Sequence, residues 1–194
     1  MKPLFGFFLL FISLRTIAQD VNPIYGLALC VNDSPIIQQR ISFVETKAKE
    51  DEASFKEFLT GRFEKGLNNF INGDATLWKE QVSRSEDVAI MGGFGAYEKG
   101  WQQVGARYEW ASARFKPSGA KAEIEYLSIA VSGDLAYTAS VERSKVHYAD
   151  TGKVEPMTLR ATHVFKKENG EWKLLHRHAD HVMEKAIPGS ATKK

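Results

Sequence analysis

Two stretches in the first half of the chain place their hydrophobic residues at helical spacing. In residues 44–72 the apolar positions follow one another mainly at steps of three and four, and they are Phe55, Leu59, Phe63, Leu67, Phe70 and Ile71. In residues 96–115 the corresponding positions are Tyr97, Trp101, Val104 and Tyr108. Such spacing gathers apolar side chains on one side of a helix. The pattern predicts two amphipathic helices, with a short strand at residues 87–91 between them.

The second half has the alternating pattern of strands. Alternation extends over residues 122–131, 135–148, 154–166 and 172–182. Turn residues separate these runs at Gly133-Asp134, Thr151-Gly152 and Asn169-Gly170, and Asn-Gly is typical of a two-residue type I′ hairpin turn. Helices followed by consecutive strands indicate an α+β fold. We therefore expect an α+β domain that ends in a four-stranded antiparallel meander.

The last hairpin predicts which side chains share a face of the sheet. A turn at Asn169-Gly170 would pair Phe165 with Leu174 and His163 with His176, and alternate residues then lie on the same side. The residues predicted for this face are Leu159, Ala161, His163, Phe165, Trp172, Leu174, His176, His178 and Asp180. This face is apolar near the turn and rich in imidazole and carboxylate at the far end. It is a candidate pocket wall.

The first 18 residues have the features of a secretory signal peptide. Lys2 precedes an apolar run over residues 4–14, and Thr16 and Ala18 are the small residues expected before a cleavage point. We therefore expect a signal peptide at 1–18 and an exported protein, periplasmic or secreted. The next segment, 19–43, has no sustained periodicity and is expected to form an irregular lead-in.

Charge and cysteine content narrow the range of partners. The chain has 26 Lys and Arg against 24 Asp and Glu, and removal of Lys2 and Arg15 with the leader leaves 24 of each sign. A net charge near zero gives no reason to expect nucleic acid, or a membrane after leader cleavage, as a partner. The single cysteine, Cys30, cannot form an internal disulfide.

Five segments resemble the SnoaL-like branch of the nuclear transport factor 2-like superfamily. They are F-I-N-G-D at 70–74, I-M-G-G-F-G at 90–95, G-W-Q-Q-V-G-A-R-Y-E-W at 100–110, G-D-L-A-Y at 133–137, and L-R-A-T-H-V-F-K-K-E-N-G-E-W-K-L-L-H-R-H-A-D at 159–180. The resemblance covers residues 45–182, and we expect the domain to span 44–184, followed by a disordered tail at 185–194. It implies a cone in which a strongly curved antiparallel sheet wraps the N-terminal helices around an apolar cavity. It also implies a homodimer formed through the sheet.

The resemblance does not imply one activity. The superfamily includes ketosteroid isomerases, polyketide cyclases and dehydratases, alongside members that only bind or assemble. Three hypotheses follow. The domain binds a small, mostly apolar molecule; or it is a cofactor-free isomerase, cyclase or dehydratase; or it is a homodimeric assembly domain with a vestigial cavity.

Candidate chemistry follows from the predicted register. A turn at Thr151-Gly152 would place Glu142, Ala161 and His178 in one row across three strands. An imidazole beside a carboxylate is the usual composition of an acid–base pair near neutral pH. The candidate catalytic residues are His178, Glu142 and Asp180, and the candidate ligand-binding residues are Tyr97, Trp101, Tyr108, Ser140, His163 and His176.

Three imidazoles on one face also raise the possibility of a metal site. His163, His176 and His178 are of the ligand type that zinc and iron accept, but no local ligand spacing accompanies them. We expect no metal and no cofactor. The opposite face is predicted to carry Arg143, Arg160 and Arg177, and we expect these arginines to line a dimer interface, where arginine is enriched.

Overall fold

The computed structural model describes residues 34–95 and 97–183. The predicted signal peptide, Cys30, the lead-in up to residue 33 and most of the predicted tail lie outside these residues. The chain divides into two compact units, residues 1–45 and 46–194. Of the first unit, residues 35–45 are helical and largely exposed.

The first helical segment is continuous from α2 (Pro35–Phe58) through one π-helical turn, η1 (Leu59–Phe63), to α3 (Glu64–Phe70). The predicted apolar stripe is confirmed, because Phe55, Leu59, Phe63 and Leu67 are buried. The expectation of an irregular lead-in is wrong for residues 35–43, which are helical. The prediction relied on a buried apolar stripe, and these residues do not have one.

A mixed sheet of six strands follows. Its elements, with the two later helices, are α4 (Thr76–Glu80), β1 (Ala89–Met91), β2 (Glu98–Lys99), α5 (Trp101–Ser112), β3 (Glu123–Ser132), β4 (Leu135–His147), β5 (Val154–Glu168) and β6 (Glu171–His181). The strand order is β2-β1-β6-β5-β4-β3, and β1 runs parallel to β6 while the other neighbours are antiparallel. The α+β class and the predicted meander are confirmed. The sheet exceeds four strands because the short β1 and β2 extend its edge.

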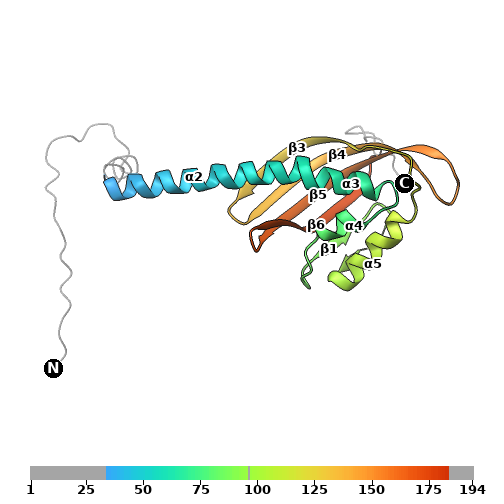
Figure 1. The fold of residues 1–194 in the computed structure, drawn as a ribbon, viewed down its shortest axis with the longest axis horizontal. Helices are drawn as coiled ribbons and strands as arrows, with labels where there is room; N and C mark the ends of the chain where they lie inside the picture. The colour runs from blue at the N-terminus through green and yellow to red at the C-terminus, as the bar shows by residue number, and fades with distance from the viewer. Residues whose placement is uncertain (1–33, 96, 184–194) are drawn as a thin grey trace, which may run out of the picture. The chain divides into compact units, whose positions relative to one another are not determined.

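The sheet curves around α3, α4 and α5, which lie against its inner face (Figure 1). Aromatic rings fill the space between these layers, and Phe165 of β5 packs against Phe55, Phe58 and Phe63 at centroid distances of 5.1, 5.6 and 5.4 Å. Packing of this kind contributes stability beyond the burial of the rings. Among the described residues, no helix is long and apolar enough to cross a membrane.

The Asn169-Gly170 turn forms as predicted. Glu168 pairs with Glu171, and Asn169 and Gly170 have φ angles of 51° and 84°. Positive φ at both central positions is what a type I′ turn requires.

The predicted register fails beyond this turn. Phe165 pairs with Leu174, but Val164 pairs with His176, so Leu175 is an extra residue in β6. An extra residue reverses which face the following side chains occupy. Arg177, Ala179 and His181 therefore face inward.

The register between β4 and β5 differs from the prediction by two residues. Glu142 pairs with Leu159 instead of Ala161, and Ser140 pairs with Ala161 instead of His163. The cause is a longer connection, because the strands stop pairing at His147 and Val154 and leave a six-residue loop in place of a two-residue turn. A shift of two residues keeps every side chain on its predicted face.

Candidate functional site

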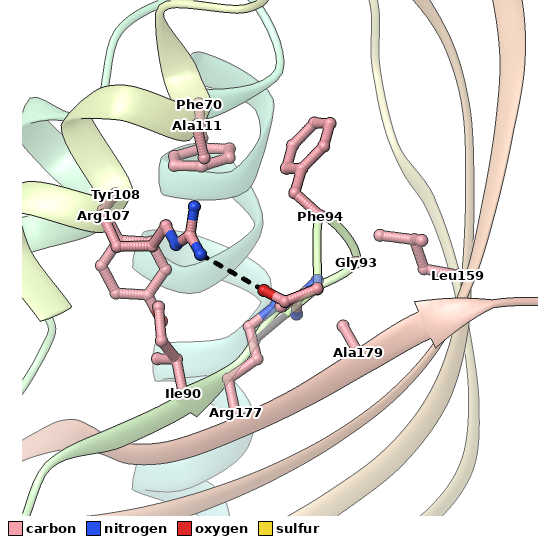
Figure 2. Close-up of a pocket in the computed structure, with 12 residues that line it drawn as sticks. Phe70, Ile90, Gly93, Phe94, Arg107, Tyr108, Ala111, Leu159, Arg177 and Ala179 are labelled. Carbon is pink, nitrogen blue, oxygen red and sulfur yellow. Dashed lines mark hydrogen bonds between the residues drawn. The ribbon is translucent and has the colours of Figure 1, made fainter. Parts of the chain in front are cut away.

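A small cavity lies on the inner face of the sheet, bounded by α5, the loop after β1, and β6 (Figure 2). Its apolar walls are formed by Phe70, Ile90, Phe94, Ala111, Leu159 and Ala179. Its polar side chains are Arg107, Tyr108 and Arg177. The cavity volume is about 70 Å³, roughly half that of a 150 Å³ engineered cavity that takes up benzene. The enclosed space therefore suits a group of a few heavy atoms.

The loop over the cavity is a glycine turn. The Gly95 amide donates to the Gly92 carbonyl at 3.0 Å, and Gly95 has a φ of 84°. A Cβ on Gly93 would lie 3.3 Å from Leu159 Cδ2, so glycine lets this loop approach β5 closely. Phe94 sits at the tip and is 42% exposed. The segment is a turn that forms one wall of the cavity.

A buried polar network lies behind the cavity and spans three strands. The Arg177 guanidinium of β6 donates two parallel hydrogen bonds to the Glu142 carboxylate of β4, each 2.7 Å long. The same guanidinium donates to His163 Nε2 of β5. His163 Nδ1 lies 3.0 Å from the Thr138 hydroxyl. All four residues are buried.

This geometry determines the tautomer of His163. A guanidinium can only donate, so Nε2 accepts and the proton resides on Nδ1, which donates to Thr138. Burial, the Arg177 charge and His176 together hold the pKa of His163 well below its ordinary value. His163 is therefore neutral at physiological pH, and Glu142 balances the charge of Arg177. Burial alone would lower the pKa of Arg177, but Glu142 outweighs it and the pKa lies above its ordinary value.

Tyr108 contributes the edge of its ring to the cavity wall. Its hydroxyl is buried and has no hydrogen-bond partner among the described residues. Burial raises the pKa of Tyr108 to about 12, so the hydroxyl stays protonated.

The predicted catalytic set is divided between the two faces of the sheet. Glu142 lies on the inner face as predicted, whereas His178 and Asp180 lie on the outer face because of the extra residue Leu175. Asp180 forms an exposed ion pair with Arg160 at 2.6 Å. The predicted Glu142–His178 row is therefore wrong.

The predicted ligand-binding residues are also dispersed. Tyr108 lines the cavity, and His163 is fully buried behind it. Tyr97 is 75% exposed, and neither it nor Trp101 is among the lining residues. His176 faces outward. Ser140 is buried on the inner face, on the same side of β4 as Glu142, and is not among the lining residues.

Sequence reasoning missed the two arginines of the cavity. Arg177 was expected on the outer face, and no feature of β6 marks Leu175 as an extra residue. Arg107 immediately precedes Tyr108 in α5, pairs with Glu98 and donates a hydrogen bond to the Gly95 carbonyl at 3.3 Å. Arg107 belongs to the G-W-Q-Q-V-G-A-R-Y-E-W segment, but nothing in the sequence indicates its contact with the loop at Gly95.

The cavity lining contains no carboxylate or imidazole among the residues described. The imidazole of His181 lies outside this lining, and its Nε2 is 3.8 Å from where a Cβ on the lining residue Gly93 would be. No group of three or more His, Cys, Asp or Glu in residues 34–95 and 97–183 is arranged to hold a metal ion.

Comparisons with known proteins agree with this architecture. The family model of the SnoaL-like domain matches residues 62–183, most of the described sheet and helices. The chain therefore belongs to the SnoaL-like domain family. No curated protein matches the chain in sequence.

Solved structures share the fold at low sequence identity. A nuclear transport factor 2-like superfamily protein from Salmonella enterica is 20% identical, with 76% of this chain and 99% of that chain covered and a TM-score of 0.58. A ketosteroid isomerase-like protein from Erwinia carotovora atroseptica is 17% identical, with coverage of 71% and 98% and a TM-score of 0.53. The association domain of C. elegans CaMKII is 13% identical, with coverage of 68% and 98% and a TM-score of 0.52. These similarities establish the fold alone.

The neutral state of His163 predicts an acid-sensitive fold. In the unfolded chain its imidazole titrates near pH 6.5, whereas its folded pKa is much lower. Below about pH 6.5 the unfolded state binds the extra proton, so the free energy of unfolding falls as pH falls, until the folded pKa is reached. Urea denaturation between pH 8 and 5 should show this slope, and His163→Gln should have a shallower one. Equal slopes in the two proteins would contradict a neutral buried His163.

Proposed function

We propose that the domain binds a small, mostly apolar molecule in the cavity between α5 and β6. The observation that carries this proposal is the cavity itself, whose walls are mainly apolar and include three polar side chains, those of Arg107, Tyr108 and Arg177 (Figure 2). Ligand sites are typically concave and apolar with a few polar groups that fix orientation. The volume of about 70 Å³ falls below the roughly 300–1,000 Å³ of sites for drug-sized ligands. The expected ligand places one small group inside and extends past Phe94.

Binding is better supported than acid–base catalysis. Both oxygens of Glu142 accept hydrogen bonds from Arg177, and His163 Nε2 is occupied by the same guanidinium. A general base must be within hydrogen-bond reach of the proton that it abstracts. With Glu142 and His163 behind Arg177, neither of them is positioned to contact a bound molecule.

Filling the cavity should abolish binding. Ala179→Leu adds a branched side chain to a wall residue that is 2% exposed, and its bulk would occupy the space that the ligand needs. A nuclear magnetic resonance screen of small ketones, alcohols and carboxylates should give shifts at the cavity residues in the wild type and none in the variant. Ala106→Leu, on the exposed side of α5, is the matched control and should bind as the wild type does. Unchanged binding in a folded Ala179→Leu protein would rule out this cavity.

A second candidate function, self-association, is favoured by the outer face of the sheet. Leu127, Leu135 and Tyr137 are 63%, 51% and 41% exposed there, and Leu127 stands at a β-bulge in β3. It borders a groove of about 420 Å³ that also contains Val141 and His178. Contiguous exposed apolar surface of this kind is typical of protein interfaces.

The charges on this face suit a second copy of the same chain. Arg143 pairs with Glu125 at 2.8 Å, and Arg160 pairs with Asp180 at 2.6 Å, so the two signs are balanced. A two-fold interface brings the same patch of both subunits together, and a balanced patch meets its copy without net repulsion. We infer a homodimer in which Leu127 lies in the interface core.

A charge at the bulge should dissociate this dimer. Leu127→Glu would bury an unpaired carboxylate against apolar surface, which costs several kcal/mol, and light scattering should report a monomer where the wild type is a dimer. Phe43→Glu introduces the same charge at an exposed residue of α2 and should leave the dimer intact. A monomeric wild type, or a Leu127→Glu variant that stays dimeric, would contradict the proposed interface.

A further inference from the structure

The arginines around the cavity differ in whether a carboxylate neutralises them. Arg177 is paired with Glu142 and Arg107 with Glu98. Arg114, which follows α5, has no carboxylate partner among the described residues. Arg114 lies one helical turn beyond Ala111 of the cavity wall, and its amide donates to the Ala111 carbonyl at 3.2 Å. Among these arginines, Arg114 is therefore the one whose charge no described carboxylate neutralises.

Aromatic side chains hold the Arg114 guanidinium in place. Its central carbon lies 3.9 Å from the Trp110 ring centroid and 5.9 Å from that of Phe94. Trp110 and Phe94 contact each other edge to face at 5.6 Å, and Phe94 is also a wall of the cavity. Stacking on an indole orients a planar guanidinium and leaves its edge free for hydrogen bonds. Arg114 is thus held against Phe94, which is itself a lining residue of the cavity.

The hydrogen-bonding capacity of Arg114 is unused. Its buried Nε atom has no acceptor among the described residues, and no side-chain hydrogen bond to any of its nitrogens occurs there. A guanidinium offers five N–H donors in a planar fork that matches the two oxygens of a carboxylate. A buried donor without a partner is costly and calls for an explanation.

We propose that the ligand of this cavity is a small amphipathic monocarboxylate, whose apolar end enters the cavity and whose carboxylate pairs with Arg114. This inference rests on the proposed binding function and adds the charge of the ligand to it. The neutralised Arg107 and Arg177 give no preference for an anion inside the cavity. Arg114, near the Phe94 wall, favours an anionic group, because it supplies both the uncompensated charge and the free donors.

Matched four-carbon probes test this assignment on the full chain. Butanoate, 1-butanol and butylammonium share one apolar end and differ in the charge of the head group. In chemical-shift titrations of the wild type, the affinity should be highest for butanoate and lowest for butylammonium. Arg114→Gln should lower the affinity for butanoate by about three- to ten-fold, the range expected for a partly exposed charge-assisted pair. The affinity for 1-butanol should not change. The preference for butanoate should also shrink as salt is added.

Two further variants separate charge from packing. Arg114→Lys keeps the charge and should retain part of the butanoate preference. Arg84→Gln removes another stacked arginine, which lies 3.3 Å over Trp101, and should change none of the affinities. Equal binding of butanoate and 1-butanol in the wild type would overturn the carboxylate assignment while binding itself stands. Loss of both ligands in Arg114→Gln without recovery in Arg114→Lys would also overturn it, and absence of binding by any probe would overturn the proposed function as well.

Discussion

A buried guanidinium and a buried carboxylate must neutralise each other, and the inner face of this sheet is organised around that constraint. Arg177 and Glu142 come from β6 and β4, with β5 between them, and each is at most 8% exposed. Breaking a buried pair by removing one partner leaves an uncompensated charge in a medium of low polarity. His163 adds a third attachment from the intervening strand. The network therefore links β4, β5 and β6 next to the cavity. It also engages Glu142 and His163 with Arg177, so that neither is free to act as a base.

Much of the fold was predictable because its signals are local. Helical spacing in residues 55–71, the four long strands and the Asn169-Gly170 turn all depend on neighbours in sequence, and all three were confirmed, although the alternation of the last strand is interrupted at Leu175. The inward position of Glu142 and His163 followed from the same alternation. The two-residue shift between β4 and β5 did not change which residues were predicted to face inward, since it preserves the face of each side chain.

The candidate site was less predictable because it depends on one extra residue. Leu175 interrupts the pairing of β6, and no residue type around it indicates a bulge. The interruption sends His176 and His178 outward and brings Arg177 inward, so an expected histidine–carboxylate pair becomes an arginine–carboxylate pair. The short β2 was equally hard to place, because its two residues carry no periodicity, whereas β1 lies within the short strand predicted at residues 87–91. Tertiary packing determines both features, and a single sequence does not record it.

Coupling between Arg177 and Glu142 is the most direct test of this account. Arg177→Met and Glu142→Leu should each lower the free energy of unfolding by about 3–5 kcal/mol, since each leaves one buried charge unpaired. The double variant replaces the pair with apolar side chains and should recover most of that loss in urea denaturation. Losses that simply add, to within about 0.5 kcal/mol, would contradict a network in which the two charges depend on each other.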